Sequence, residues 1–155
     1  MSDDPFGGRH VVRSYRDDDR ESVLQLLRDS PQASQWAPDS ARLNAAGTEL
    51  AWVLEVTGKV VGFLHLRAVA DEAEILNLAI SMPNHRQGLA SILVRQALQD
   101  EQLAAVQSVY LEVRASNDPA LSFYRHIGFT ASGRRLAYYS NPVEDAILMT
   151  KKLTG

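Results

Sequence analysis

The segment from Leu76 to Ala90 constrains the fold of this chain most, because an apolar run passes through a short turn and a glycine into an amphipathic pattern. The apolar run indicates a strand, and after Gly88 the residues Leu89, Ile92 and Leu93 recur at helical spacing. The first amides of a helix have no partner within the helix, and the helix dipole is positive at that end. A strand, turn and helix of this kind can therefore hold a diphosphate group.

The composition favours one domain with one core, since the chain has 155 residues, of which 45% are hydrophobic. We expect residues 10–153 to form that domain and residues 1–9 to form a flexible tail. The net charge of -3 gives no basic field for nucleic acid, and no run of 18 apolar residues indicates a membrane span. No cysteine is present, which excludes disulfides and cysteine nucleophiles. We expect a cytoplasmic protein, a monomer or weak homodimer, without membrane or direct nucleic-acid partners.

The first half of the sequence predicts a strand, two helices and a three-stranded antiparallel meander. Asp18 and Glu21 resemble a capping box at the start of the first helix, and Thr57-Gly58-Lys59 is typical of a hairpin turn. The expected elements are a strand over residues 11–15, helices from Asp17 to Arg28 and from Asp39 to Ala46, and strands at Leu50 to Val56, Val60 to Leu66 and Ala73 to Ile80.

The second half predicts a helix, a strand, a second helix and two closing strands. Val109, Leu111 and Val113 alternate with Tyr110, Glu112 and Arg114, which is the pattern of a strand with two different faces. The expected elements are a helix from Gly88 towards Leu103, the strand Val109 to Arg114, a helix with Asp118 as N-cap, Pro119 first and Gly128 beyond its end, and strands at Phe129 to Leu136 and Ala146 to Leu153. Tyr138, Tyr139 and Pro142 are expected in the last connection. This order predicts an α+β domain with a mixed sheet.

Two stretches carry a family resemblance. His85-Arg-Gln-Gly-Leu-Ala90 is similar to the acetyl-CoA signature of the GNAT acetyltransferases, Gln/Arg-x-x-Gly-x-Gly/Ala, with histidine at the first position and the allowed alanine at the last. Residues 110–117 and 120–129 resemble the RimI-like branch, the ribosomal-protein alanine N-acetyltransferases. The resemblance implies a single GNAT-like domain whose central, mostly antiparallel sheet is splayed at the middle strands and flanked by helices.

The resemblance also implies acetyl-CoA as the co-substrate. Its contacts are expected at Leu78, Ala79, Ile80, Arg86, Gln87, Gly88, Leu89, Ala90, Ser91 and Asn117. Strand amides would bind the thioester and pantetheine, while the turn would bind the diphosphate. For residues 78–80, plain core packing is the alternative.

By the same resemblance, Glu112 is the general base and Tyr124 the general acid. A peptide α-amine with a pKa of 7.7 to 8.0 is roughly one-seventh neutral at pH 7, so a carboxylate can complete its deprotonation. A phenol can protonate the departing CoA thiolate. From the residues alone, the favoured interpretation is a solvated strand carboxylate for Glu112 and a packing aromatic for Tyr124.

The implied reaction is transfer of acetyl to the N-terminal α-amine of a protein, and the branch implies an alanine-first ribosomal protein. Acetylation of a lysine or a small-molecule amine, and a noncatalytic acyl-CoA-binding module, remain alternatives. Tyr138 and Tyr139 either close over a peptide or cover the sheet. The four histidines show no metal spacing with the acids, and Asp17-Asp18-Asp19 is interpreted as a helix start, so no metal site is predicted.

Overall fold

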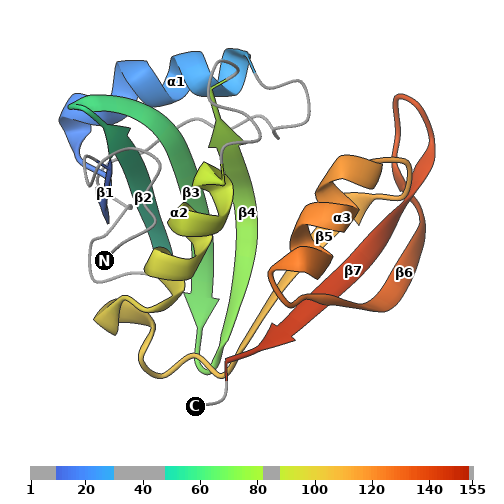
Figure 1. Cartoon of the computed structure of the whole chain (residues 1–155). Helices are drawn as coiled ribbons and strands as arrows, with labels where there is room; N and C mark the ends of the chain where they lie inside the picture. The colour runs from blue at the N-terminus through green and yellow to red at the C-terminus, as the bar shows by residue number, and fades with distance from the viewer. Residues whose placement is uncertain (1–9, 30–47, 82–87, 154–155) are drawn as a thin grey trace. The chain divides into compact units, whose positions relative to one another are not determined.

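The computed structural model describes residues 10–29, 48–81 and 88–153, and within these ranges it contains seven strands and three α-helices. The strands have the order β1-β2-β3-β4-β5-β7-β6, with antiparallel and parallel neighbours. The α+β class with a mixed sheet is therefore confirmed. Two compact units divide the chain (Figure 1). The first unit comprises residues 1–68 and 75–104, and the second unit comprises residues 69–74 and 105–155.

The first unit is built on an antiparallel meander. Its strands are β1 (His10–Ser14), β2 (Glu49–Val56), β3 (Lys59–Val69) and most of β4 (Glu72–Ile80). β1 pairs with β2 and β2 with β3 in antiparallel register, and β4 runs opposite to β3 (Figure 1). The loop between β2 and β3 consists of Thr57 and Gly58, both with positive φ, which suits the twist of a two-residue hairpin. The predicted meander is confirmed.

Two helices cover opposite faces of this meander. Helix α1 (Arg20–Arg28) buries Val23 in a cluster with Phe63 of β3. Helix α2 (Leu89–Leu98) places Leu93 only 3.3 Å from where a Cβ at Gly62 would stand. Because Gly62 and Phe63 are successive strand residues, they face opposite sides of the sheet. The predicted extension of α2 to residue 103 is wrong.

The break after α2 has a local cause. Asp100 is extended (φ -64, ψ 140) and its carboxylate accepts from the Gln102 amide, which starts the separate 3-10 turn η3 (Glu101–Leu103). The same carboxylate accepts from Trp52 Nε1 of β2 at 2.9 Å. A helix continued through Asp100 would lose both hydrogen bonds.

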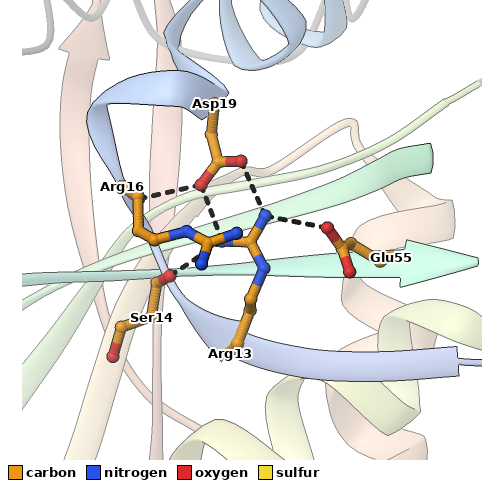
Figure 2. Close-up of polar contacts among 5 residues, drawn as sticks. All are labelled: Arg13, Ser14, Arg16, Asp19 and Glu55. Carbon is orange, nitrogen blue, oxygen red and sulfur yellow. Dashed lines mark hydrogen bonds and ion pairs between the residues drawn. The ribbon is translucent and has the colours of Figure 1, made fainter. Parts of the chain in front are cut away.

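The chain enters α1 through a partly buried ion-pair cluster (Figure 2). The turn η1 (Asp17–Asp19) precedes α1, and the carboxylate of Asp19 accepts from the Arg16 amide at 2.8 Å and from both terminal nitrogens of Arg13. The predicted capping box of Asp18 and Glu21 is therefore wrong. Asp19 takes that place because it is the one acid of the three that turns inward, at 4% exposure.

The second unit is a three-stranded antiparallel sheet with one helix. It contains β5 (Ser108–Arg114), α3 (Asp118–His126), β6 (Thr130–Tyr139) and β7 (Glu144–Lys152). β7 lies between β5 and β6, and Glu72 to Glu74 of β4 pair in parallel with Ser108 to Tyr110 of β5. The splaying of β4 and β5 beyond these pairs stays a prediction.

Two local assignments in the second unit are corrected. The N-cap of α3 is Asn117, whose Oδ1 accepts from the Ala120 amide at 3.2 Å, so Asp118 is the first helical residue. Tyr138 and Tyr139 end strand β6 and do not lie in the connection. The helix does end as predicted, with Gly128 at a φ of 106 just past it. The predicted helix from Asp39 to Ala46 and the tail of residues 1–9 lie outside the described residues.

Candidate active site

The predicted cofactor residues of β4 use their side chains for packing. Ala79 is 4% exposed and belongs to the core cluster of the first unit. Ile80 is 9% exposed, and its Cδ1 would come within 2.9 Å of a Cβ at Gly62. Leu78 is half-buried. The core-packing alternative is therefore correct for the side chains of Ala79 and Ile80, so any cofactor contact there has to come from the backbone.

The start of α2 has the geometry that an anion requires. Gly88 is the N-cap, with a φ of 77, and as a glycine it has no side chain of its own to cap this helix end. The first backbone bond of the helix runs from the Ile92 amide to the Gly88 carbonyl. The amides of residues 89–91 come before it, in the first turn where a helix supplies no acceptor of its own. Leu89 is buried at 1%, which anchors the turn. Arg86 and Gln87 lie outside the described residues.

Glu112 lies on one face of β5 in a polar cluster rather than in open solvent. Its side chain is 11% exposed, and Oε1 lies 3.1 Å from Nε of Arg135 on β6. The phenol of Tyr138 lies near enough to the same carboxylate to interact with its charge. The alternation of β5 is confirmed, since residues 109, 111 and 113 are buried on its other face.

Tyr138 and Tyr139 border this carboxylate. The charge of Glu112, followed by burial, raises the pKa of Tyr138, while burial followed by Glu112 raises the pKa of Tyr139. The rings meet edge to face at 5.1 Å. Arg114 lies over the Tyr139 ring at 4.2 Å, a cation–π distance, and forms an ion pair with Glu144 at 3.4 Å. Both tyrosines are thus fixed beside Glu112, and both phenols stay neutral at physiological pH.

Tyr124 lies in the packed interior of the second unit. It is 8% exposed, and its ring contacts Phe123 at 5.0 Å and Phe129 at 5.4 Å, both edge to face. Burial raises its pKa well above the ordinary value of a phenol. The packing alternative and a proton-donor role are compatible here, because a buried phenol remains protonated and so still carries the proton that it would donate.

Asn117 has a structural task at the start of α3. Its side-chain oxygen accepts a hydrogen bond from the Ala120 amide at 3.2 Å, which fixes the side chain at the helix start. The histidines within the described residues are dispersed: His65 stacks on Phe63 and lies 3.3 Å from Glu49 in the first unit, while His126 ends α3. In the described part of the chain, no three His, Cys, Asp or Glu side chains are grouped to hold a metal ion.

Comparison with known proteins decides the family. The profile of the Acetyltransferase (GNAT) family matches residues 13–129. This chain belongs to the GNAT acetyltransferase family. It is 33% identical to the [ribosomal protein bS18]-alanine N-acetyltransferase of Escherichia coli strain K12 over 119 residues, which cover 76% of this chain and 80% of that protein.

Two further comparisons agree. Over 141 residues the chain is 32% identical to a putative [ribosomal protein bS18]-alanine N-acetyltransferase of Bacillus subtilis strain 168, covering 90% of this chain and 93% of that protein. The crystal structure of the Escherichia coli ribosomal-protein-S18-alanine N-acetyltransferase superposes with a TM-score of 0.78 at 26% identity, covering 94% and 95% of the two chains. The expected family, its RimI-like branch and its fold are therefore confirmed.

The residues that the resemblance assigns to this GNAT enzyme fall into two groups. The described cofactor candidates of β4 and α2 belong to the first unit, and Glu112, Asn117 and Tyr124 belong to the second. Their roles remain predictions. No helix among the described residues is long and apolar enough to cross a membrane.

Sequence analysis missed two polar groups of this family member, one of them buried and one exposed. Asn77 is 5% exposed, and a lone amide inside the apolar run of β4 was a signal that could have found it. Arg135 pairs with Glu112 from a strand that is separated from β5 by β7. Nothing local to Arg135 marks it, because its neighbour Arg134 has the same charge and lies in the same strand.

Proposed function

We propose that this GNAT acetyltransferase uses acetyl-CoA to acetylate the N-terminal α-amine of a protein, and that the acceptor is an alanine-first ribosomal protein. The observation that carries the proposal is the identity of 33% over 119 residues to a relative named for this reaction. Because ribosomal proteins are made in the cytoplasm, the reaction is proposed to occur there.

The first unit suits the diphosphate of acetyl-CoA. The left-handed Gly88 turns the chain into α2, and the amides of Leu89, Ala90 and Ser91 follow a cap residue that has no side chain. Together with the positive end of the helix dipole, these amides can bind two phosphate groups. We propose that Arg86 and Gln87 extend this cradle and that the β4 backbone at residues 78–80 binds the pantetheine and thioester.

The second unit supplies the proposed proton transfers. Glu112 accepts a proton from the amine, whose nitrogen attacks the thioester carbonyl; the amide bond forms and the carbon–sulfur bond breaks. Tyr124 gives its proton to the leaving thiolate and regains one from solvent. The acetyl group passes directly to the amine without an acyl-enzyme, and no residue in this scheme acts as a nucleophile.

The experiment is a competition among three acceptors. The purified protein and acetyl-CoA are incubated with an alanine-first ribosomal peptide, an N-terminally blocked lysine peptide and a small polyamine, and mass spectrometry locates the acetyl group. We expect acetate on the α-nitrogen of the first peptide. Preferred acetylation of lysine or polyamine would overturn the proposed acceptor. Binding of acetyl-CoA without turnover of any acceptor would favour a noncatalytic module instead.

A further inference from the structure

The carboxylate of Glu112 is covered by a cation of its own unit. Glu112 lies opposite Leu148 of β7, and Arg135 lies opposite Ala146, two residues away on the same strand. Residues two apart share a face, so β5 and β6 present these two side chains on the same side of the sheet. Nε of Arg135 reaches Oε1 of Glu112 at 3.1 Å, with exposures of 59% and 11%. The acid is enclosed while the guanidinium faces solvent.

Arg135 is held at this position by a second contact. Its guanidinium lies 5.5 Å from the centre of the Tyr138 ring, a cation–π distance, and Tyr138 also interacts with the charge of Glu112. The arginine is therefore fixed between the carboxylate and the aromatic ring. The other charged groups that act on the two tyrosines beside Glu112 are Glu74 of β4, Arg114 of β5 and Glu144 of β7.

We propose that Arg135 is a positioning residue that selects acceptors by the protonation of their amine. Its charge offsets that of Glu112, so the acceptor site favours amines that enter neutral and disfavours those that enter as ammonium ions. The inference rests on the proposed function, in which Glu112 is the base, and it identifies a device that separates α-amines from lysine side chains.

The physical argument is one of charge. A largely buried carboxylate without a partner attracts an ammonium ion. When the carboxylate is paired with a guanidinium, the positive charge of the guanidinium repels the incoming ammonium ion. At pH 7 roughly one-seventh of α-amines are neutral, but fewer than about one in a thousand lysine amines are. A site that repels ammonium ions therefore still binds a substantial fraction of α-amines, but it excludes almost all lysine amines.

The test compares Arg135→Gln with Arg134→Gln. Arg134 is the matched control, because it is the adjacent residue, is 56% exposed and pairs with Asp145 at 2.7 Å rather than with Glu112. Two quantities are measured at pH 7: the ratio of kcat/KM for the alanine-first peptide to that for the blocked lysine peptide, and the Ki of the lysine peptide as a competitor of the first. The Ki is measurable even where lysine turnover is undetectable.

We expect Arg135→Gln to lower the Ki of the lysine peptide about tenfold, the effect of one unit of pKa on a charged ligand. Wherever lysine turnover is measurable, the ratio of kcat/KM values should fall by the same factor. Arg134→Gln leaves both quantities unchanged, and Arg135→Lys restores them because it restores the charge. The wild-type Ki of the lysine peptide falls as the pH rises above about 9, where lysine begins to lose its proton, whereas the Ki of a quaternary ammonium analogue, whose charge is fixed, does not fall.

Three results would overturn the inference. An unchanged Ki in Arg135→Gln would show that the charge of Arg135 does not select among acceptors. An equal change of the Ki in Arg134→Gln would show that any positive charge on this strand has the same effect. A failure of Arg135→Lys to restore the Ki shows that guanidinium geometry and not charge is responsible. All three can occur while the α-amine is acetylated normally, which leaves the proposed function intact. A wild type that acetylates only lysine overturns both proposals. Thermal melting of each variant checks that the exposed substitutions leave the fold intact.

Discussion

The two terminal nitrogens of Arg13 donate to the two carboxylate oxygens of Asp19, at 2.8 and 2.7 Å (Figure 2). Arg13 also reaches Glu55 at 2.9 Å, so one guanidinium joins β1, the start of α1 and β2. Paired, bidentate contacts of this kind are the strongest hydrogen bonds between side chains. They fix the first helix of the chain to the meander it covers.

Asp19→Asn should destabilise the protein by about 3 kcal/mol, because the guanidinium of Arg13 then loses its bidentate partner at a largely buried position. Urea denaturation followed by circular dichroism measures the free energy of unfolding. Asp18→Asn is the matched control: Asp18 is exposed, and the change should stay within about 0.5 kcal/mol. Equal losses in the two variants would mean that the triple aspartate acts only through the helix dipole.

The same contact should make stability depend on pH in the acid range. Burial alone raises the pKa of Asp19, but hydrogen bonds from Arg13 and the Arg16 amide outweigh it, and the net pKa lies below its usual value. The stabilisation is therefore complete above the unfolded pKa of about 3.9 and is lost as the pH falls through the lower folded value. Urea midpoints of the wild type should fall more steeply below pH 4 than those of Asp19→Asn. Parallel curves would contradict this.

Elements with local signals could be predicted from the sequence. The alternation of β5 and the end of α3 at Gly128 depend on neighbouring residues alone, and both were correct. The start of α3 was misplaced by one residue, since Asn117 and Asp118 are both good N-caps and the choice depends on the preceding turn. The family signature also located the start of α2 at its glycine.

What could not be predicted depends on partners distant in sequence. Tyr138 and Tyr139 stay in β6 because the register with β7 shifts between Arg135 and Tyr139, where Ala137 has a φ of 52. The pairing of Glu112 with Arg135 follows from that sheet register and not from spacing. Likewise, three successive aspartates gave no sign that Asp19 would turn inward. Such choices are settled only when strands are assembled.

Gly88→Ala should weaken acetyl-CoA binding, because an alanine at a φ of 77 is strained and tilts the amides of the proposed cradle. The cost in stability should be about 1 kcal/mol. Gly58→Ala is a close control: its φ is 79, and at both glycines an added Cβ would meet no atom within 4 Å among the described residues, the chain neighbours apart. The two variants should lose similar stability, but calorimetry should show a raised Kd only for Gly88→Ala. A raised Kd in both would contradict the cradle.

Glu112→Gln should lower kcat about 100-fold with a peptide α-amine, because the amide cannot accept the proton, while the Kd of acetyl-CoA should stay unchanged. The rate should still rise with pH as the amine loses its proton. Asp118→Asn, an exposed isosteric change on α3 in the same unit, controls for the loss of one negative charge. Steady-state kinetics from pH 6 to about 9 gives the profiles. A kcat within twofold of the wild type would remove Glu112 from the reaction.

Tyr124→Phe separates proton donation from packing. The ring contacts with Phe123 and Phe129 survive the substitution, so thermal stability should change little, whereas kcat should fall about 100-fold if the hydroxyl protonates the thiolate. Tyr15→Phe is the control, since Tyr15 is also buried, at 5%, with its ring edge to face against Phe63. It should leave kcat unchanged. A leaving group of lower pKa needs no proton, so an activated acetyl thioester should restore the rate of Tyr124→Phe. Without such rescue, the tyrosine would act on the fold of α3 and not on the leaving sulfur.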